Sequence, residues 1–177
     1  QNVFEGGFLG LDNIGVFDRS SPLPTGGFLE QADGTAWMCL FCQNMLEMSL
    51  ELSNMDENYT EMGSKFVEHF VWIAAAMDKI GEREDEMWDE QDGFYYDVLR
   101  LPSGEAFRLK VRSMVGLLPL CASTMFEEDT LTRHPRLLEL IAVFRKRHPE
   151  VLAHVAPTVE GFKGYAGRRL LSPLTRS

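Results

Sequence analysis

The sequence predicts a mainly α-helical fold with one small β-hairpin, and three observations lead to this prediction. Two long segments repeat their apolar residues at the three- and four-residue spacing of a helix. A later stretch has strand-like runs on both sides of a Pro-Ser-Gly turn at 102–104. Strands and helices do not alternate, which argues against a parallel sheet. With 177 residues, 45% of them hydrophobic, the chain can bury a core as a single domain.

Residues 1–32 are expected to form an ordered loop layer. Glycine and proline interrupt this segment repeatedly, which is typical of turns. Large apolar side chains are nevertheless too frequent there for a flexible linker: Phe4, Phe8, Leu9, Leu11, Ile14, Val16, Phe17, Leu23 and Phe28. The layer should therefore lie on a hydrophobic surface.

Four helices are expected after this layer, over residues of about 33–53, 56–81, 113–126 and 134–147. Asp33 is a candidate N-cap of the first helix, and Ser113 of the third. Pro119 should kink the third helix, whereas Pro135 suits the first turn of the fourth. The first helix is expected to bury one apolar face, made of Trp37, Leu40, Phe41, Met45, Met48 and Leu52.

A hairpin over residues of about 94–111 separates the second helix from the third. Paired helices whose connecting loops carry aromatic and acidic residues suggest an α/α toroid or a helical array. No strict repeat of roughly 34 or 40 residues is visible, which makes an ordinary helical solenoid less favoured.

Charge is unevenly distributed along the chain. The formal net charge is −10, with 24 acidic and 8 basic residues in 1–130 but 3 acidic and 9 basic residues in 131–177. The acidic body should repel nucleic acid and anionic membranes, so neither is an expected partner. No apolar run approaches the roughly 18–20 residues of a membrane span.

The cysteines favour a reducing compartment. Cys39, Cys42 and Cys121 form an odd set inside apolar stretches, unlike the framework of a secreted disulfide-rich protein. No secretory signal is visible, and we expect a cytoplasmic protein. Cys39 and Cys42 could also be a redox pair, although their apolar helical setting favours core packing.

The first candidate site is the glycine-rich segment around Asp12 and Asn13. A carboxyl group among apolar residues has its charged form disfavoured and its pKa raised, as a general acid near neutral pH requires. Asn13 could orient Asp12 by a hydrogen bond, and the glycines would allow close approach of the backbone to a ligand. An ordinary turn would also explain an Asp-Asn pair in such a loop.

The second candidate site is the segment 88–97, where carboxylates alternate with aromatic residues. Sugar rings pack on aromatic faces, and their hydroxyl groups need acceptors such as Asp92 and Asp97. A solvated acidic turn before a hairpin is an equally reasonable interpretation. The spacing does not fit a calcium-binding loop, because Trp88 and Leu99 would occupy the first and last ligand positions. No metal or cofactor is expected.

Two segments together resemble the catalytic region of glycoside hydrolase family 63 and its mannosylglycerate-hydrolase-like relatives. They are residues 2–20, NVFEGGFLGLDNIGVFDRS, and residues 88–97, WDEQDGFYYD. The resemblance covers essentially the whole chain, and its longer motif is the more specific. It implies an (α/α)6 toroid, here incomplete, that hydrolyses α-glucosidic or related α-linked sugars with inversion.

The resemblance also implies roles for particular residues. Asp12 falls on the general acid of the family, beside Asn13. Asp33 and Trp37 match a helix start that faces the substrate pocket in relatives, although the family's Asp-Leu-Asn-Ala reads Asp-Gly-Thr-Ala at 33–36. The remaining expected substrate-binding residues are Asp92, Tyr96 and Asp97, for which a structural role is equally compatible.

The resemblance places the catalytic base outside this chain. Inversion needs a second carboxylate, about 6.5–9.5 Å from the acid, to activate water. We therefore expect a hydrolase fragment that is inactive alone, with an oligosaccharide or small glycoside as substrate of the parent protein. Exposed apolar seams should promote self-association. The alternative is a non-enzymatic helical scaffold that binds proteins through an acidic face.

Overall fold

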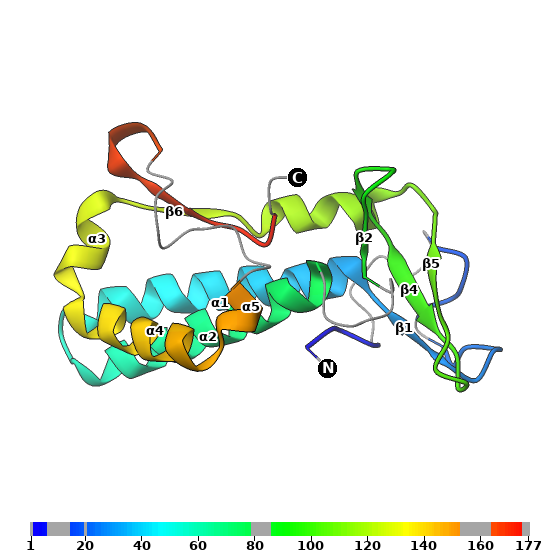
Figure 1. Cartoon of the computed structure of the whole chain (residues 1–177), viewed down its shortest axis with the longest axis horizontal. Coiled ribbons are helices and arrows are strands. Elements are labelled where there is room, and N and C mark those ends of the chain that lie inside the picture. Colours follow the sequence, from blue (N-terminus) through cyan, green and yellow to red (C-terminus); the bar gives the residue numbers. More distant parts are fainter. Residues whose placement is uncertain (1, 7–14, 20, 79–85, 153–163, 175–177) are drawn as a thin grey trace. The chain divides into compact units, whose positions relative to one another are not determined.

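The computed structural model describes residues 2–6, 15–19, 21–78, 86–152 and 164–174. About half of the chain is helical, and three small antiparallel sheets accompany the helices (Figure 1). The fold is therefore mixed, and the prediction of a mainly helical chain with one hairpin was wrong in its sheet content. The described residues do not show a toroid.

The chain divides into two compact units, each built from two segments of sequence. The first unit comprises Gln1–Met38 and Ala76–Cys121, and the second comprises Cys39–Ala75 and Ala122–Ser177. The two long helices, α1 (Ala32–Ser53) and α2 (Asn58–Asp78), contribute residues to both units.

The first unit contains a three-stranded antiparallel sheet of order β1-β4-β5. Its strands are β1 (Phe28–Glu30), β4 (Asp97–Arg100) and β5 (Ala106–Leu109). The pairing of β4 with β5 confirms the predicted hairpin around residues 102–104. Strand β1 comes from the predicted loop layer, and Phe4 forms a further bridge to Gln31. The described part of the layer is therefore ordered by backbone pairing.

A second sheet pairs β2 (Trp88–Asp89) with β3 (Phe94–Tyr95). The run of residues 94–99, expected as one strand, is thus divided between two sheets. The division falls at Tyr96, whose backbone N–H donates to the carbonyl of Met87 at 2.8 Å. Gly93 makes the turn of this ribbon with a φ of 58°.

Helix α1 begins one residue before the predicted start, and its cap differs from the prediction. The carbonyl of Gln31 accepts the helical hydrogen bond from Thr35 N–H at 3.0 Å, so Gln31 precedes the first turn. Asp33 lies inside that turn, and its expected N-cap role was wrong. The carboxylate of Asp97 on β4 accepts the N–H of Ala32 at 2.8 Å instead. A residue distant in sequence therefore supplies the cap.

The buried face of α1 is also not the predicted one. Four members of the expected face are exposed: Trp37 47%, Phe41 54%, Met48 53% and Leu52 41%. The buried residues of this helix are mainly smaller or polar, and they include Cys39, Cys42, Gln43, Leu46 and Leu50. Helix α1 is apolar on two sides, and periodicity alone cannot decide which side packs within the chain.

Helix α2 agrees with the prediction over the described residues, and the expected end at 79–81 lies outside them. The carboxylate of Asp56 accepts the N–H of Asn58 at 3.0 Å and caps the helix. Phe70 and Ala74 are fully buried in the core.

The third predicted helix, 113–126, was only partly right. Residues Met114–Cys121 form a 3₁₀ helix, η1, and Thr124–Phe126 form strand β6. Strand β6 pairs with β7 (Arg169–Leu171), which the sequence did not indicate. Pro119 interrupts a continuous α-helix, because it lacks the N–H and its ring clashes with the carbonyl four residues earlier.

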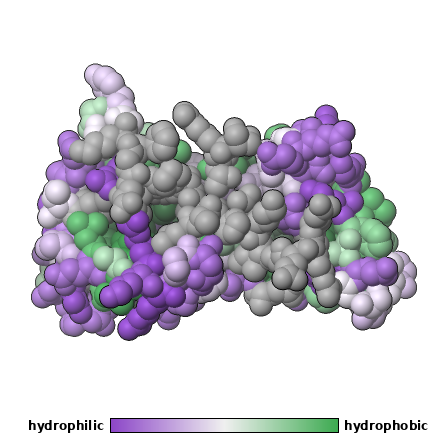
Figure 2. Space-filling view, viewed as in Figure 1, coloured by the Kyte–Doolittle hydropathy of each residue, from purple (hydrophilic) through white to green (hydrophobic). Residues whose placement is uncertain are grey.

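The fourth predicted helix is confirmed as α4 (Pro135–Arg147). Leu137, Ile141 and Phe144 form its buried face, and Trp72 of α2 meets the Phe144 ring edge-on, with centroids 6.3 Å apart. Two short helices, α3 (Glu128–Arg133) and α5 (Pro149–Leu152), flank it, and a 3₁₀ turn, η2 (Tyr165–Gly167), precedes β7. On the face seen in Figure 2, hydrophobic areas lie among hydrophilic side chains.

A change of Gly116 to Ala should destabilise the first unit. A Cβ at this buried position of η1 would lie 2.2 Å from Phe94 Cε1 and 2.2 Å from the backbone oxygen of Tyr95. Because a backbone atom cannot move away cheaply, we expect a loss of about 1–3 kcal/mol in urea unfolding. Gly63→Ala in α2 is the control: its Cβ would lie 3.5 Å from Leu46 Cδ1, and alanine should gain about 0.5–1 kcal/mol in a helix. Equal effects of both changes would contradict this packing.

Candidate functional site

The first unit contains a buried ionic cluster centred on Arg19. The Arg19 side chain donates from Nη1 to Asp33 Oδ2 at 2.8 Å and from Nη2 to Gln31 Oε1 at 2.8 Å. Nη2 also pairs with Asp33 Oδ1 and lies 3.7 Å from Asp97 Oδ2. Arg19, Gln31, Asp33 and Asp97 are each less than a tenth exposed, and we call them the Arg19 cluster. A bidentate arginine–carboxylate pair in such a setting fixes geometry strongly.

The Arg19 cluster joins three segments that are far apart in sequence. Gln31 and Asp33 stand at the junction of β1 and α1, and Asp97 begins β4. The register of β1 with β4, in which Glu30 faces Val98, brings this junction beside Asp97. Arg19 ties the end of the glycine-rich segment to the same place, so sheet pairing and one ion pair assemble the site.

Electrostatics in this cluster raise the pKa of Asp97. One guanidinium serves two buried carboxylates, which leaves a negative charge in a poorly solvated place. Burial, and to a smaller extent the charge of Asp33, raise the pKa of Asp97 to about 6, although Arg19 and the N–H of Ala32 oppose the shift. Asp97 therefore keeps its proton to a higher pH than an ordinary aspartate does.

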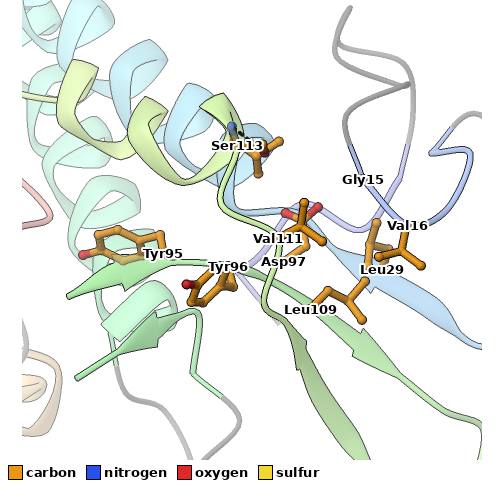
Figure 3. A pocket seen from close by; sticks show the side chains of 10 residues that line it. Gly15, Val16, Leu29, Tyr95, Tyr96, Asp97, Leu109, Val111 and Ser113 are labelled. Carbon is orange, nitrogen blue, oxygen red and sulfur yellow. Dashed lines mark hydrogen bonds between the residues drawn. The ribbon is translucent and has the colours of Figure 1, made fainter. Parts of the chain in front are cut away.

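A small cavity lies against Asp97. Figure 3 shows the side chains of Val16, Leu29, Leu109 and Val111 near Asp97, with the two tyrosines beyond them. Its volume of about 10 Å³ is roughly the space of one water molecule. This cavity is therefore too small for a sugar ring, and its apolar walls account for the poor solvation of Asp97.

Asp97 should make stability depend on pH in a defined window. Its pKa of about 6 in the folded state exceeds the ordinary 3.8, so the folded protein binds the proton more tightly than the unfolded chain. The stability that Asp97 contributes is present below about pH 4 and is lost as the pH rises to 6. Relative to Asp97→Asn, the wild-type free energy of unfolding should fall by about 1–3 kcal/mol across this window. A difference that grows with pH would contradict this assignment.

A second ionic cluster lies where the turn of the β2–β3 ribbon meets the end of β5. Lys110 Nζ contacts Asp89 Oδ2 at 2.8 Å and Asp92 Oδ2 at 3.1 Å. Arg112 Nη2 lies 3.1 Å from Asp92 Oδ1, and Tyr96 Oη donates to Asp92 Oδ2 at 3.1 Å. The Lys110 hydrogen bonds lower the pKa of both carboxyl groups. These carboxylates are held as anions by cations of the chain itself.

The predicted site residues fall into four groups. Asp33 and Asp97 meet in the Arg19 cluster, and Asp92 and Tyr96 meet in the Lys110 cluster. Trp37 lies on α1 with about half of its surface exposed. Asp12 and Asn13 lie outside the described residues.

Five members of these clusters were not among the predicted site residues: Arg19, Gln31, Asp89, Lys110 and Arg112. Arg19 stands inside the longer motif, yet its partner Asp97 is 78 residues away, and no local spacing indicates that pair. Lys110 directly follows β5, and its contact with Asp89 on β2 joins two different sheets, which no local spacing indicates.

The thiols do not support a redox function. Cys39 and Cys42 are buried one turn apart in α1, and burial raises the pKa of both. A reactive thiol needs a lowered pKa and access to solvent. Within the described ranges, no three His, Cys, Asp or Glu side chains lie close enough to hold a metal ion. No helix in these ranges is both long and apolar enough to cross a bilayer.

Comparison with known proteins identifies a homologous protein, but that protein has no assigned function. The chain is 42% identical over 187 aligned residues to the uncharacterised protein YMR196W of Saccharomyces cerevisiae, with 99% of this chain covered. The chain spans 17% of the length of that relative. No family model matches the chain. No solved structure matches it either.

Proposed function

We propose that the chain is part of an inverting glycoside hydrolase of the family 63 type, acting on α-glucosidic or related α-linked sugars. The observation that supports this most is the Arg19 cluster. It connects the two motifs that carry the resemblance, the longer through Arg19 and the second through Asp97, with the helix start at Asp33. Segments that contribute to one active site need such a connection, and a toroid completed by further chain would provide the rest.

In this proposal Asp12 is the general acid that protonates the leaving oxygen, and Asn13 orients it. Asp33, Asp97 and Arg19 hold the surrounding segments, because their charges are already paired inside the protein. Tyr96 and Asp92 stabilise the second motif, and Trp37 offers a half-exposed ring on which a sugar could pack. No metal or cofactor takes part.

The catalytic base is proposed to lie outside this chain. The buried carboxylates of the described first unit lie beside cations: Glu30 beside Arg100, Asp33 and Asp97 beside Arg19, and Asp89 beside Lys110. A base that activates water must keep an oxygen free for that water. Ion-paired carboxylates of this kind are better suited to support than to proton abstraction.

The full-length gene product and this 177-residue chain should be assayed together on α-linked glucosides and mannosides. Hydrolysis by the longer protein alone would support a shared active site of which this chain supplies one part. Hydrolysis by the isolated chain would contradict the external base. Inactivity of both on the whole panel would leave the hydrolase proposal without support.

The second candidate function is a helical scaffold that binds proteins through an acidic face. The exposed apolar residues of α1, among them Phe41 and Met48, favour it. Self-association through such surfaces stays a prediction for light scattering at rising concentration. We also propose a cytoplasmic location, which the free thiols Cys39, Cys42 and Cys121 favour.

A further inference from the structure

Apolar side chains are exposed on the helical hairpin that α1 and α2 form in the second unit. Helix α1 contributes Phe41 and Met48, about half exposed, and Leu52, 41% exposed; Met62 of α2 is 45% exposed. Met45 and Phe66 are half-buried beside them. We call these six residues the hairpin face. Exposed apolar residues gathered in this way mark interaction sites far more often than single ones do.

The hairpin face has the geometry of a helix-packing seam. On α1 its members follow one another at intervals of four, three and four residues, from Phe41 through Met45 and Met48 to Leu52. This spacing places them in one line along the helix, as in the contact stripe of paired helices. The Phe41 and Phe66 rings meet edge-on with centroids 6.4 Å apart, which makes the two helices one continuous surface. A third helix would fit such a surface.

Charge decides what kind of helix would bind. Residues 39–75 contain six Asp or Glu residues and one Lys. Five of these acidic side chains are exposed: Glu47, Glu51, Asp56, Glu57 and Glu61. Two copies of this hairpin brought face to face would confront like charges, whereas a cationic partner would be attracted.

We propose that the hairpin face binds an amphipathic α-helix whose apolar stripe is flanked by lysine and arginine. Its apolar side chains would cover Phe41, Met48 and Leu52, and its cations would lie near Glu51 and Glu61. This helix comes from outside the 177 residues of the chain. The proposal rests on burial, spacing and charge within the second unit, and it stands whether or not the protein is a hydrolase.

The test uses the whole chain and two synthetic helical peptides with the same leucine stripe, one flanked by lysine and the other by glutamate. Fluorescence anisotropy should show at least about tenfold tighter binding of the lysine-flanked peptide, with a preference that shrinks as salt screens the charges. Met48→Glu should weaken this binding by about tenfold or more, since a charge would enter the seam. Val143→Glu is the matched control, because Val143 is 47% exposed on α4 and should not affect binding.

A second variant, Glu51→Lys with Glu61→Lys, tests the charge preference independently of Met48→Glu, because it leaves the apolar residues of the hairpin face unchanged. Both positions are exposed, and the reversed protein should lose most of its preference for the lysine-flanked peptide. Equal binding of both peptides to the wild type, or an unchanged preference after the reversal, would overturn the proposal. A homodimer in sedimentation that Met48→Glu abolishes would assign the surface to a second copy instead and would equally overturn it.

Discussion

Replacing Asp12 with Asn in the full-length protein should lower kcat for hydrolysis of an α-linked substrate by about 10²- to 10⁴-fold. This is the usual contribution of a positioned general acid or base. Asparagine preserves the size of the side chain and removes the proton that the leaving oxygen needs. The loss should be smaller for an activated leaving group, such as a nitrophenolate, because that group departs with less protonation. KM should change little by comparison.

The matched control for Asp12 is Glu5→Gln, which removes an exposed carboxylate seven residues earlier in the same motif. Its kcat should equal that of the wild type. If Asp12→Asn hydrolyses both kinds of substrate at the wild-type rate, Asp12 is not the general acid. An equal loss for both leaving groups would indicate a structural role for Asp12.

Arg19→Met should produce the largest loss of stability, about 3–5 kcal/mol in urea unfolding. Methionine keeps much of the volume of arginine but leaves the carboxylates of Asp33 and Asp97 buried without their cation. The penalty comes from these unpaired charges more than from lost contacts. Adding Asp33→Asn to the variant should therefore recover part of the loss, which a purely steric effect would not allow.

The control for Arg19 is Arg168→Met, which breaks the ion pair between Arg168 and Glu127. That pair is exposed, with its atoms 3.0 Å apart, and surface pairs contribute about 0–1 kcal/mol. A loss for Arg19→Met as small as the control, or no recovery in the double variant, would show that the cluster does not hold the first unit together.

The predictions that succeeded depend on local patterns. The long helices α1 (Ala32–Ser53) and α2 (Asn58–Asp78), the helix at Pro135–Arg147 and the hairpin around 102–104 follow from apolar spacing and turn residues. The failures depend on pairing over long distances. Strand β1 forms by pairing with β4, and β6 by pairing with β7, which begins more than 40 residues later. The local sequence of neither strand shows a clear strand pattern.

For the candidate site, too, the sequence predicted residues within local motifs but not their partners from distant parts of the chain. The motifs indicated Asp33, Asp92, Tyr96 and Asp97 as residues of interest, and the structure places each of them in an ionic cluster. Their cationic partners could not be inferred from the sequence. Arg19, for example, meets Asp33 and Asp97 only after the chain has folded. For α1, the sequence shows a stripe of apolar residues, but it does not show that Phe41, Met48 and Leu52 are exposed to solvent.

The anomeric form of the first product would test the hydrolase proposal most directly. An α-linked substrate should be treated with the full-length protein and followed by proton NMR before the free sugar equilibrates. Inversion predicts that the β-anomer appears first, since water attacks the face opposite to the leaving group. Early appearance of the α-anomer would contradict inversion, and absence of any released sugar would contradict hydrolysis itself.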